Sequence, residues 1–337
     1  MRKLFASASL IAAISLLAGC APVAETETTA TETEVATESA FPVTIEHAFG
    51  ETVIESEPER VVAMGWGAAD AAIALGVIPV AIPAQFYGGD ENGVLPWIQE
   101  AVDGLGVEVP EVIADVDGIP NYEAIAAAMP DVIIAPYSGL DQEQYDTLTA
   151  IAPVVAYPGV AWSTPWRDII TITGKALGKE AQALAILDEI SAEVAAAADA
   201  NPAFAGKTIA EVWPGDGIFY VYREADARVE FATDLGFEVD PTVEALAPAD
   251  APTFYYTLAL ESLGDLDSDV LLIYGTTDEE IEAFIASPEG QLMDQVVEGR
   301  YAKLVGPSLI ASVGPPTALS LSWGLESFVS ALAGAIK

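Results

Sequence analysis

Short apolar runs alternate with stretches of helical spacing along the body of the chain. Four runs in the first half are predicted strands: 61–64 (VVAM), 77–83 (VIPVAIP), 131–136 (DVIIAP) and 154–159 (VVAYPG). Between the first two, the stretch 68–76 (AADAAIALG) has the spacing of a helix that ends at Gly76. Strands and helices that alternate in this way predict a mostly parallel sheet with helices on both faces.

The second half of the chain repeats the order of the first. The run 207–213 (KTIAEVW) corresponds to the first strand, and 229–239 (VEFATDLGFEV) has the helix-to-strand pattern of segment 68–80. This repeat is too long for a solenoid. It predicts an α/β fold with two similar lobes.

One phrase recurs in both halves with the same spacing. Glu123 precedes Asp131 by eight residues, and Glu261 precedes Asp269 by eight. Each aspartate leads into an apolar run, so we expect it to begin an equivalent strand in each lobe.

Helical signals join the two halves. Thr164 is a typical N-cap and Pro165 is typical of the first helical position, so a helix is predicted to begin there. Further helix follows through an alanine-rich stretch. We therefore expect an N-terminal lobe at 41–163, a linking helix and a following helix at 164–200, and a C-terminal lobe at 201–337. A single stiff crossing predicts limited hinge motion between the lobes.

The N-terminus has the pattern of a secretory signal. Residues 1–3 supply positive charge, residues 4–18 are largely apolar, and the run LLAGC ends at Cys20. That ending resembles the lipobox of bacterial lipoproteins, which implies cleavage of a signal peptide at 1–19 and a lipid on the Cys20 sulfur. The following acidic stretch, up to residue 40, is a predicted disordered tether. We expect a protein anchored by its lipid at the outer face of the cytoplasmic membrane.

Composition narrows the class of partner. The chain has 337 residues, of which 52% are hydrophobic, enough for two cores, and its formal net charge is −40. So negative a protein repels polyanions, which excludes nucleic acid as a partner. Cys20 is the only cysteine in the chain, so no intramolecular disulfide can form.

Aromatic residues follow the predicted strands in both lobes. Ligands of open parallel sheets bind beyond the carboxyl ends of the strands, so the residues there are candidate ligand contacts. These candidates are Trp66, Phe86, Tyr87, Tyr137 and Trp162 in the first lobe, and Trp213, Tyr222, Arg223 and Tyr274 in the second. The alternative is that the aromatic rings pack the cores and the contact between the lobes, and that Arg223 is a solvated surface cation.

The sequence offers little for catalysis. His47 is the only histidine and lies in a predicted N-terminal hairpin that turns at Gly50, far along the chain from every strand-end loop. A catalytic triad therefore lacks its base, and a His-rich metal site lacks its imidazoles. No GxxxxGK[ST] phosphate loop occurs in the sequence. We predict a protein that is not an enzyme and has no intrinsic cofactor.

Several motifs together resemble the ferric-siderophore-binding lipoproteins of ABC importers, and they keep that family's order from about Phe41 to the end. They are the lipobox, PERVV at 58–62, the segment around LGV at 75–77, PNYEAIAAAMPDVII at 120–134, WRD to GKALGKEA within 166–181, and LESLGDLDSDVL at 260–271. The resemblance implies two lobes joined by a rigid long helix, with a ligand cleft between them. Relatives that bind haem or cobalamin share this plan and leave those ligands open as alternatives.

The resemblance also implies partners for this chain. Members of the family use a glutamate on each lobe to dock on arginines of the membrane permease. The permease in turn connects the binding protein to the ATPase. Glu123 and Glu261 are the matching positions in this chain. A monomer carrying one charge on each lobe suits a two-fold permease. Since Arg223 is the one cleft cation expected, a ferric hydroxamate is favoured over an anionic ferric catecholate. An extracytoplasmic enzyme and an adhesion or scaffold lipoprotein are the alternatives from other classes.

Overall fold

The computed structural model describes residues 40–215, 217–252 and 254–336. They belong to one compact unit, Ser39–Lys337. The predicted signal peptide, Cys20 and the tether up to residue 39 lie outside the described residues. Among the helices that are described, none combines the length and apolar character needed to cross a bilayer.

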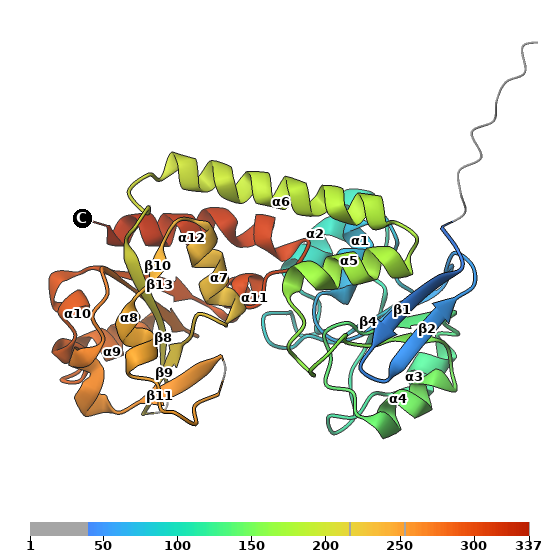
Figure 1. Ribbon diagram of the computed structural model, residues 1–337, viewed down its shortest axis with the longest axis horizontal. Coiled ribbons are helices and arrows are strands. Elements are labelled where there is room, and N and C mark those ends of the chain that lie inside the picture. The colour runs from blue at the N-terminus through green and yellow to red at the C-terminus, as the bar shows by residue number, and fades with distance from the viewer. Residues whose placement is uncertain (1–39, 216, 253, 337) are drawn as a thin grey trace, which may run out of the picture. The chain divides into compact units, whose positions relative to one another are not determined.

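The N-terminal lobe is built on a parallel sheet in the order β5-β4-β3-β6-β7 (Figure 1). Its strands are β3 (Val61–Ala63), β4 (Ala81–Pro83), β5 (Glu111–Ile113), β6 (Val132–Ile134) and β7 (Val154–Val155). Its helices are α1 (Ala68–Ala74), α2 (Pro96–Leu105), α3 (Tyr122–Ala127) and α4 (Gln142–Thr149). Alternate strand residues pack on opposite faces, because Val61 joins the core of α1 and α2 whereas Val62 joins the core of α3 and α4.

The C-terminal lobe has a mixed sheet in the order β11-β9-β8-β12-β13, with β10 beside β8. Its strands are β8 (Thr208–Gly215), β9 (Ile218–Tyr222), β10 (Glu238–Val239), β11 (Tyr255–Leu258), β12 (Val270–Gly275) and β13 (Tyr301–Val305). Strands β9 and β11 run antiparallel to their neighbours, unlike any strand of the first sheet. The chain reverses immediately after β8, with Gly217 at a φ of 76°, so a hairpin stands where the N-terminal lobe has a helix.

Helices cover this second sheet and join it to the first. The C-terminal lobe carries α7 (Ala227–Asp234), α8 (Pro241–Ala245), α9 (Asp278–Ala286), α10 (Asp294–Glu298), α11 (Pro307–Val313) and α12 (Ser320–Ala335), and the short 3-10 helices η1 (Leu260–Asp265) and η2 (Gly290–Leu292). The crossing between the lobes consists of α5 (Trp166–Ala176) and the long α6 (Glu180–Ala200), which packs along α5 and α12 (Figure 1). Gly178, at a φ of 66°, separates the two helices.

One apolar core runs through both lobes. It contains Val61 of β3, Ile170 of α5, Ile190 of α6 and Leu304 of β13. The predicted α/β fold with two lobes joined by helix is confirmed. A shared core resists hinge opening, because separating the lobes would expose apolar surface.

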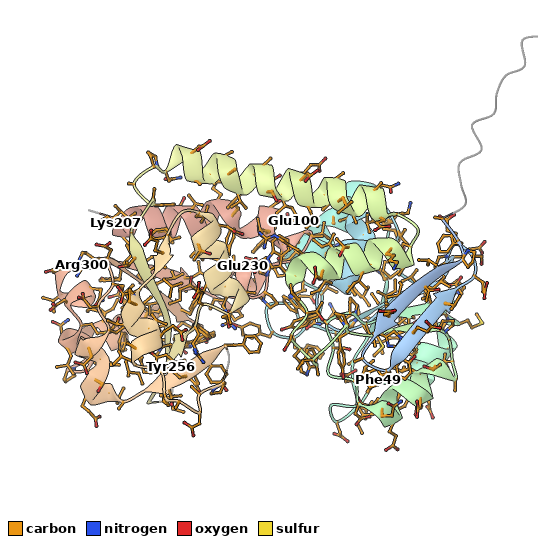
Figure 2. The ribbon with its side chains drawn as sticks, in the orientation of Figure 1. Phe49, Glu100, Lys207, Glu230, Tyr256 and Arg300 are labelled. Carbon is orange, nitrogen blue, oxygen red and sulfur yellow. The ribbon has the colours of Figure 1, made fainter. Side chains whose placement is uncertain are left out.

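The N-terminal hairpin is held by its histidine. Strands β1 (Val43–His47) and β2 (Gly50–Ile54) pair antiparallel. The Nδ1 atom of His47 accepts a hydrogen bond from the Phe49 amide at 3.2 Å, and Nε2 lies 2.9 Å from Thr52 Oγ1. The Phe49 ring, labelled in Figure 2, stacks on Tyr145 with centroids 4.6 Å apart. His47 is a packed structural residue, as its distance from the strand-end loops leads one to expect.

Acidification is expected to loosen this hairpin. Burial lowers the pKa of His47 below 6.5, so the folded state holds the ring neutral. The contribution of neutral His47 to the stability of the folded state is full above its pKa in the unfolded chain, and it is lost as the pH falls through its pKa in the folded protein. Thermal unfolding of the wild type and of His47→Phe, from about pH 7.5 to 5, measures this effect. The wild type should lose more of its melting temperature than the variant; equal losses would contradict the assignment.

Candidate functional site

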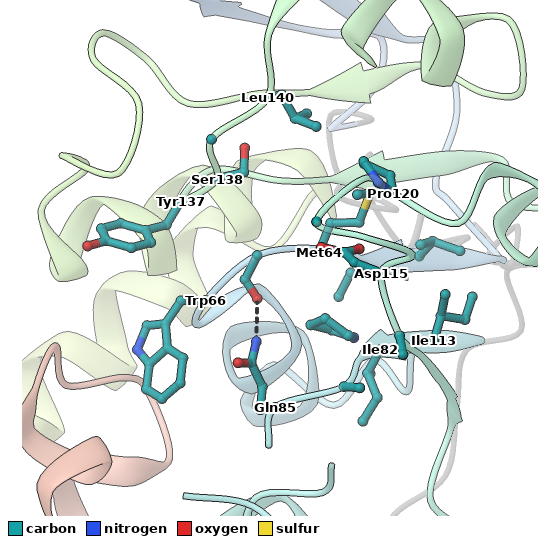
Figure 3. Close-up of a pocket in the computed structure, with 18 of the residues that line it drawn as sticks. Met64, Trp66, Ile82, Gln85, Ile113, Asp115, Pro120, Tyr137, Ser138 and Leu140 are labelled. Carbon is teal, nitrogen blue, oxygen red and sulfur yellow. Dashed lines mark hydrogen bonds between the residues drawn. The ribbon is translucent and has the colours of Figure 1, made fainter. Parts of the chain in front are cut away.

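Two pockets open at the strand ends, one on each lobe. The N-terminal pocket has a volume of about 580 Å³ and lies at the carboxyl ends of β3, β4 and β5, with Met64, Ile82 and Ile113 in its wall (Figure 3). The C-terminal pocket has a volume of about 950 Å³ and lies between β8, β9, η1 and α9. Both volumes are in the range of small-molecule sites.

Trp66 lines the N-terminal pocket immediately after β3 and is tied to the C-terminal lobe. Its indole Nε1 donates to the Pro315 carbonyl at 2.8 Å, and Pro315 lines the same pocket. Beneath it, the buried Asp70 carboxylate accepts from Trp97 Nε1 at 2.6 Å and from Thr317 Oγ1 at 2.5 Å. These bonds fix the pocket wall across the contact between the lobes, which preorganises the site.

Tyr137 and Trp162 form a second aromatic corner of the N-terminal pocket. Their rings meet edge to face with centroids 5.7 Å apart. The Trp162 indole lies directly on Gly139, where a β-carbon would come within 2.2 Å of its Nε1. Trp162 also adopts a left-handed φ of 58° and stays 52% exposed. Trp162 therefore combines a left-handed backbone with a partly exposed ring at the pocket rim.

Tyr87 and Phe86 extend the rim from the loop after β4. Both line the N-terminal pocket, and both side chains are exposed, Phe86 at 66% and Tyr87 at 48%. Burial of its hydroxyl raises the pKa of Tyr87 to about 12, with opposing contributions from Arg228, which lowers it, and Tyr222, which raises it. Tyr87 therefore lies within electrostatic range of Arg228 and Tyr222 on the C-terminal lobe.

The C-terminal pocket contains Trp213 and Tyr222 of the predicted set, together with Arg228. The guanidinium of Arg228 lies over the Tyr222 ring, 4.1 Å from its centroid, and Nε donates to Asp226 Oδ1 at 3.0 Å. Its aliphatic stem packs on Gly314, a residue of the N-terminal pocket, where a β-carbon would lie 2.8 Å from Arg228 Cδ. Arg228 thus stands where the two pockets adjoin.

Two predicted site residues lie elsewhere. Arg223, expected as the cleft cation, lines neither pocket; its guanidinium pairs with Glu244 at 2.5 Å and donates to the Pro252 carbonyl. Tyr274 is completely buried beneath the C-terminal pocket, and its hydroxyl donates to Glu211 Oε2 at 2.5 Å. Arg228, rather than Arg223, is therefore the arginine that lines a pocket, and Tyr274 lies beneath the pocket wall.

Arg228 is not among the residues predicted from strand ends, because it lies on helix α7 rather than in the loop after a strand. A signal for it was nevertheless present in the sequence. Arg228 occupies the first turn of α7, whose N-cap is Asp226. A cation there opposes the helix dipole, so its presence needs another reason, such as a ligand.

Carboxylates outnumber cations in the walls of the pockets. Asp115, Glu280 and Glu289 line them, with Arg228 as the one cation among the described lining residues. Within residues 40–215, 217–252 and 254–336, no three His, Cys, Asp or Glu side chains gather as a metal site. The arrangement suits a bulky, largely uncharged ligand with oxygen acceptors for Arg228 and flat surfaces for the aromatic rings.

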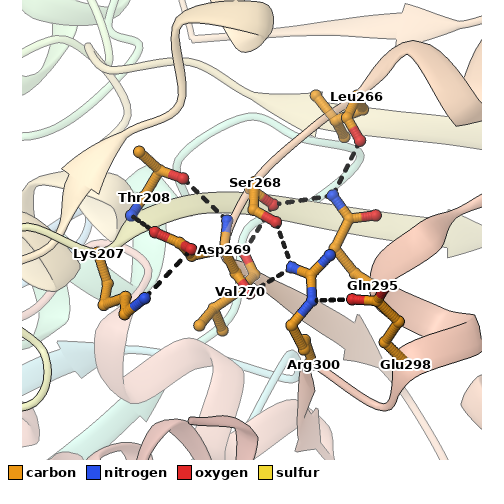
Figure 4. A network of polar contacts seen from close by, with 9 residues as sticks. All are labelled: Lys207, Thr208, Leu266, Ser268, Asp269, Val270, Gln295, Glu298 and Arg300. Carbon is orange, nitrogen blue, oxygen red and sulfur yellow. Dashed lines mark hydrogen bonds and ion pairs between the residues drawn. The ribbon is translucent and has the colours of Figure 1, made fainter. Parts of the chain in front are cut away.

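In the repeat of a glutamate and an aspartate eight residues apart, the aspartates are structural and the glutamates are exposed. Asp131 accepts from the Arg60 amide at 3.0 Å, at the start of β3, and Asp269 accepts from the Thr208 amide at 3.1 Å, at the start of β8 (Figure 4). The hydrogen bond from the Thr208 amide, with a smaller contribution from Lys207, lowers the pKa of Asp269. Each aspartate therefore fixes the start of the neighbouring strand.

The two glutamates of the repeat, Glu123 and Glu261, are exposed to solvent. Glu123 is exposed in the first turn of α3, and Glu261 is exposed in the first turn of η1. A carboxylate in a helix's first turn is favoured by the dipole, but it remains available to a partner.

Known proteins share this sequence pattern and fold. The sequence profile of the family described as periplasmic binding protein matches residues 61–304. The Bacillus subtilis protein named "Probable siderophore-binding lipoprotein YfiY" is 27% identical over 234 residues, which is 68% of each chain. The structure of Streptococcus pneumoniae PiaA in complex with ferrichrome is 34% identical, with a TM-score of 0.77, and covers 87% of this chain and 98% of that one. A periplasmic solute binding protein from Mycobacterium smegmatis is 28% identical, with a TM-score of 0.75, and covers 88% and 99%.

Proposed function

Because the chain belongs to the periplasmic binding protein family, we propose that it is an extracytoplasmic binding protein that captures a ferric siderophore for an ABC importer. One observation carries this proposal: aromatic rings of both lobes line two pockets that adjoin at Arg228. The iron is cargo, enclosed in its organic chelator, so the protein binds the chelator and needs no metal ligands of its own.

The charges of the site favour a ferric hydroxamate. Arg228 already has Asp226 as a partner, and the other charged residues lining the pockets are carboxylates. A highly anionic catecholate complex would meet these carboxylates in a protein of net charge −40. A neutral hydroxamate complex avoids that repulsion and still offers oxygen atoms to the N–H donors of the guanidinium.

The ligand residues proposed for this capture come from both lobes. They are Trp66, Tyr87, Tyr137 and Trp162 on the N-terminal side, and Trp213, Tyr222 and Arg228 on the C-terminal side. Aromatic faces bury the organic shell of the complex, and Arg228 fixes its orientation. No residue among them is assigned a catalytic role.

Ligand titration tests the proposed function. The full chain, purified in detergent, is titrated with ferrichrome, a ferric catecholate, haem and cobalamin while tryptophan fluorescence is followed. We expect ferrichrome to quench the fluorescence most strongly, because Trp66, Trp162 and Trp213 line the pockets. Tight binding of the catecholate alone would contradict the hydroxamate preference. A response to haem or cobalamin alone would move the assignment to those ligands.

Delivery and anchoring complete the proposal. Glu123 and Glu261, one exposed carboxylate on each lobe, would dock on basic residues of a two-fold permease that works with its ATPase. The lipid is proposed at Cys20, so that a monomer is held at the outer face of the cytoplasmic membrane.

A further inference from the structure

A buried carboxylate lies directly beneath the C-terminal pocket without a full set of partners. Glu211, on β8, is 1% exposed. Its Oε2 atom accepts from Tyr274, while Oε1 has no hydrogen-bond partner among the described residues. A carboxylate so placed is costly to ionise, and core packing alone does not account for it.

Contacts connect Glu211 to the ligand-facing surface. The Tyr274 ring lies under Trp213, with centroids 6.3 Å apart, and meets the Tyr222 ring edge to face at 5.6 Å. Arg228 lies in turn on Tyr222. The carboxyl group is therefore two ring contacts away from the guanidinium that we assign to the ligand, in an interior where charges act over longer distances than in water.

The charged and titratable groups around Glu211 are few. Tyr274 faces it from β12, Tyr222 from β9, and Asp226 and Arg228 from the start of α7. Helix α11, on the same face of the sheet, has no titratable side chain. The remaining α7 carboxylates, Glu230 and Asp234, pair with Arg167, and the exposed Glu326 is the one titratable residue of α12. Among the described residues, Glu211 is thus the one carboxyl with a buried oxygen that lacks a hydrogen-bond partner.

We propose that Glu211 is a positioning residue whose protonation state sets how strongly Arg228 attracts the oxygen atoms of the bound complex. When Glu211 is ionised, two negative charges, on Asp226 and Glu211, oppose Arg228, and its positive potential in the pocket is reduced. When Glu211 is protonated, only Asp226 opposes Arg228. Capture is therefore favoured on the acid side of the Glu211 titration, and ligand binding draws a proton onto the carboxyl. This inference rests on the proposed function.

Physiological pH is where this coupling operates. Burial, more than any other cause, raises the pKa of Glu211 from 4.5 to about 7, with the Tyr274 hydrogen bond acting in the opposite direction. The coupling thus acts where small changes in local acidity alter the charge.

A ligand-free measurement tests whether Glu211 titrates. The folded-state pKa is raised, so its contribution to stability is full below 4.5 and is lost as the pH rises through about 7. The melting temperature of full-length wild type should therefore fall relative to Glu211→Gln by a few degrees between about pH 5 and 8. A constant difference across this range would overturn the titration.

Ferrichrome affinity tests the coupling itself. Across about pH 5.5 to 8.5, the wild type should bind up to about tenfold more weakly at the alkaline end, since one pKa unit of linkage is a tenfold change. Glu211→Gln should bind equally at all pH values, at the acid-limit affinity of the wild type. Glu279→Gln is the matched control, because Glu279 is exposed on α9 and lines neither pocket. It should keep the wild-type profile.

A second variant covers the case in which Glu211→Gln does not fold. Tyr274→Phe keeps the ring and removes the donor to the carboxylate, so the transition in affinity should move to higher pH. An unshifted transition, or a wild-type profile in Glu211→Gln, overturns the inference while leaving capture intact. Loss of ferrichrome binding by the wild type at every pH contradicts the proposed function instead, and the coupling with it.

Discussion

Replacing Arg228 by glutamine is expected to weaken ferrichrome binding by about thirtyfold, whereas the same replacement at Arg223 should leave it unchanged. A hydrogen bond from a charged donor contributes about 1.5 to 3 kcal/mol, which is roughly ten- to hundredfold in affinity. Arg228 lines the C-terminal pocket over Tyr222, while Arg223 is held outside both pockets by Glu244. Titration of both variants, followed by tryptophan fluorescence, measures the difference.

Arg228→Lys distinguishes the charge of this residue from its shape. Lysine keeps the positive charge but lacks the planar fork that lies on the Tyr222 ring, so intermediate affinity is expected. Circular dichroism checks that each variant is folded, because Arg228→Gln leaves the Asp226 carboxylate without its cation. Equal affinities for Arg228→Gln and Arg223→Gln in folded proteins would remove Arg228 from the site.

Reversing the charge of both Glu123 and Glu261 to arginine is expected to reduce iron uptake to background while leaving ferrichrome affinity unchanged. Both carboxylates are exposed, and neither lines a pocket. Like charges at a docking interface cost several kcal/mol, enough to prevent productive encounter with basic residues of a permease. The effect is measured as the uptake of ⁵⁵Fe-ferrichrome by cells in which the variant is the only copy of this binding protein.

Reversing two other exposed glutamates, one on α6 and one on α12, controls for the change in net charge. Glu180 and Glu326 are exposed on α6 and α12. Both helices lie away from α3 in Figure 1. The double reversal of these two glutamates to arginine changes the net charge equally and should leave uptake near the wild-type rate. Uptake that survives the reversal at Glu123 and Glu261 would show that docking uses other residues.

Most of the architecture could be predicted from the pattern of apolar residues. The runs at 61–64 and 131–136 are apolar on both faces, which is the property of a strand buried between two helix layers. The hairpin of β8 and β9 was harder to predict. Residues 207–213 have the same apolar pattern as the first strand of the chain, and the reversal that follows depends on local turn conformation around Gly217 rather than on hydrophobic spacing.

The positions of some aromatic candidates could likewise be predicted from the sequence, whereas the burial of others could not. Trp66, Tyr87, Tyr137 and Trp162, chosen for their positions after strands, line one pocket, because strand ends in a parallel sheet open on one edge. The same reasoning could not tell that Tyr274 points into the core, since successive side chains of a strand alternate between faces and the burial of each face depends on the helices above it.

The two-lobed α/β plan, the helical crossing and the repeated aspartate at equivalent strands all follow from the amino-acid sequence, because they depend on periodicity and local hydrogen bonding. Which arginine lines a pocket, and which carboxyl is buried beneath it, depends on tertiary packing instead. Arg223 and Arg228 are five residues apart in one chain segment. Their surroundings come from Glu244, Asp226 and Gly314. Long-range packing brings those neighbours together, and charge, burial and pKa follow from them.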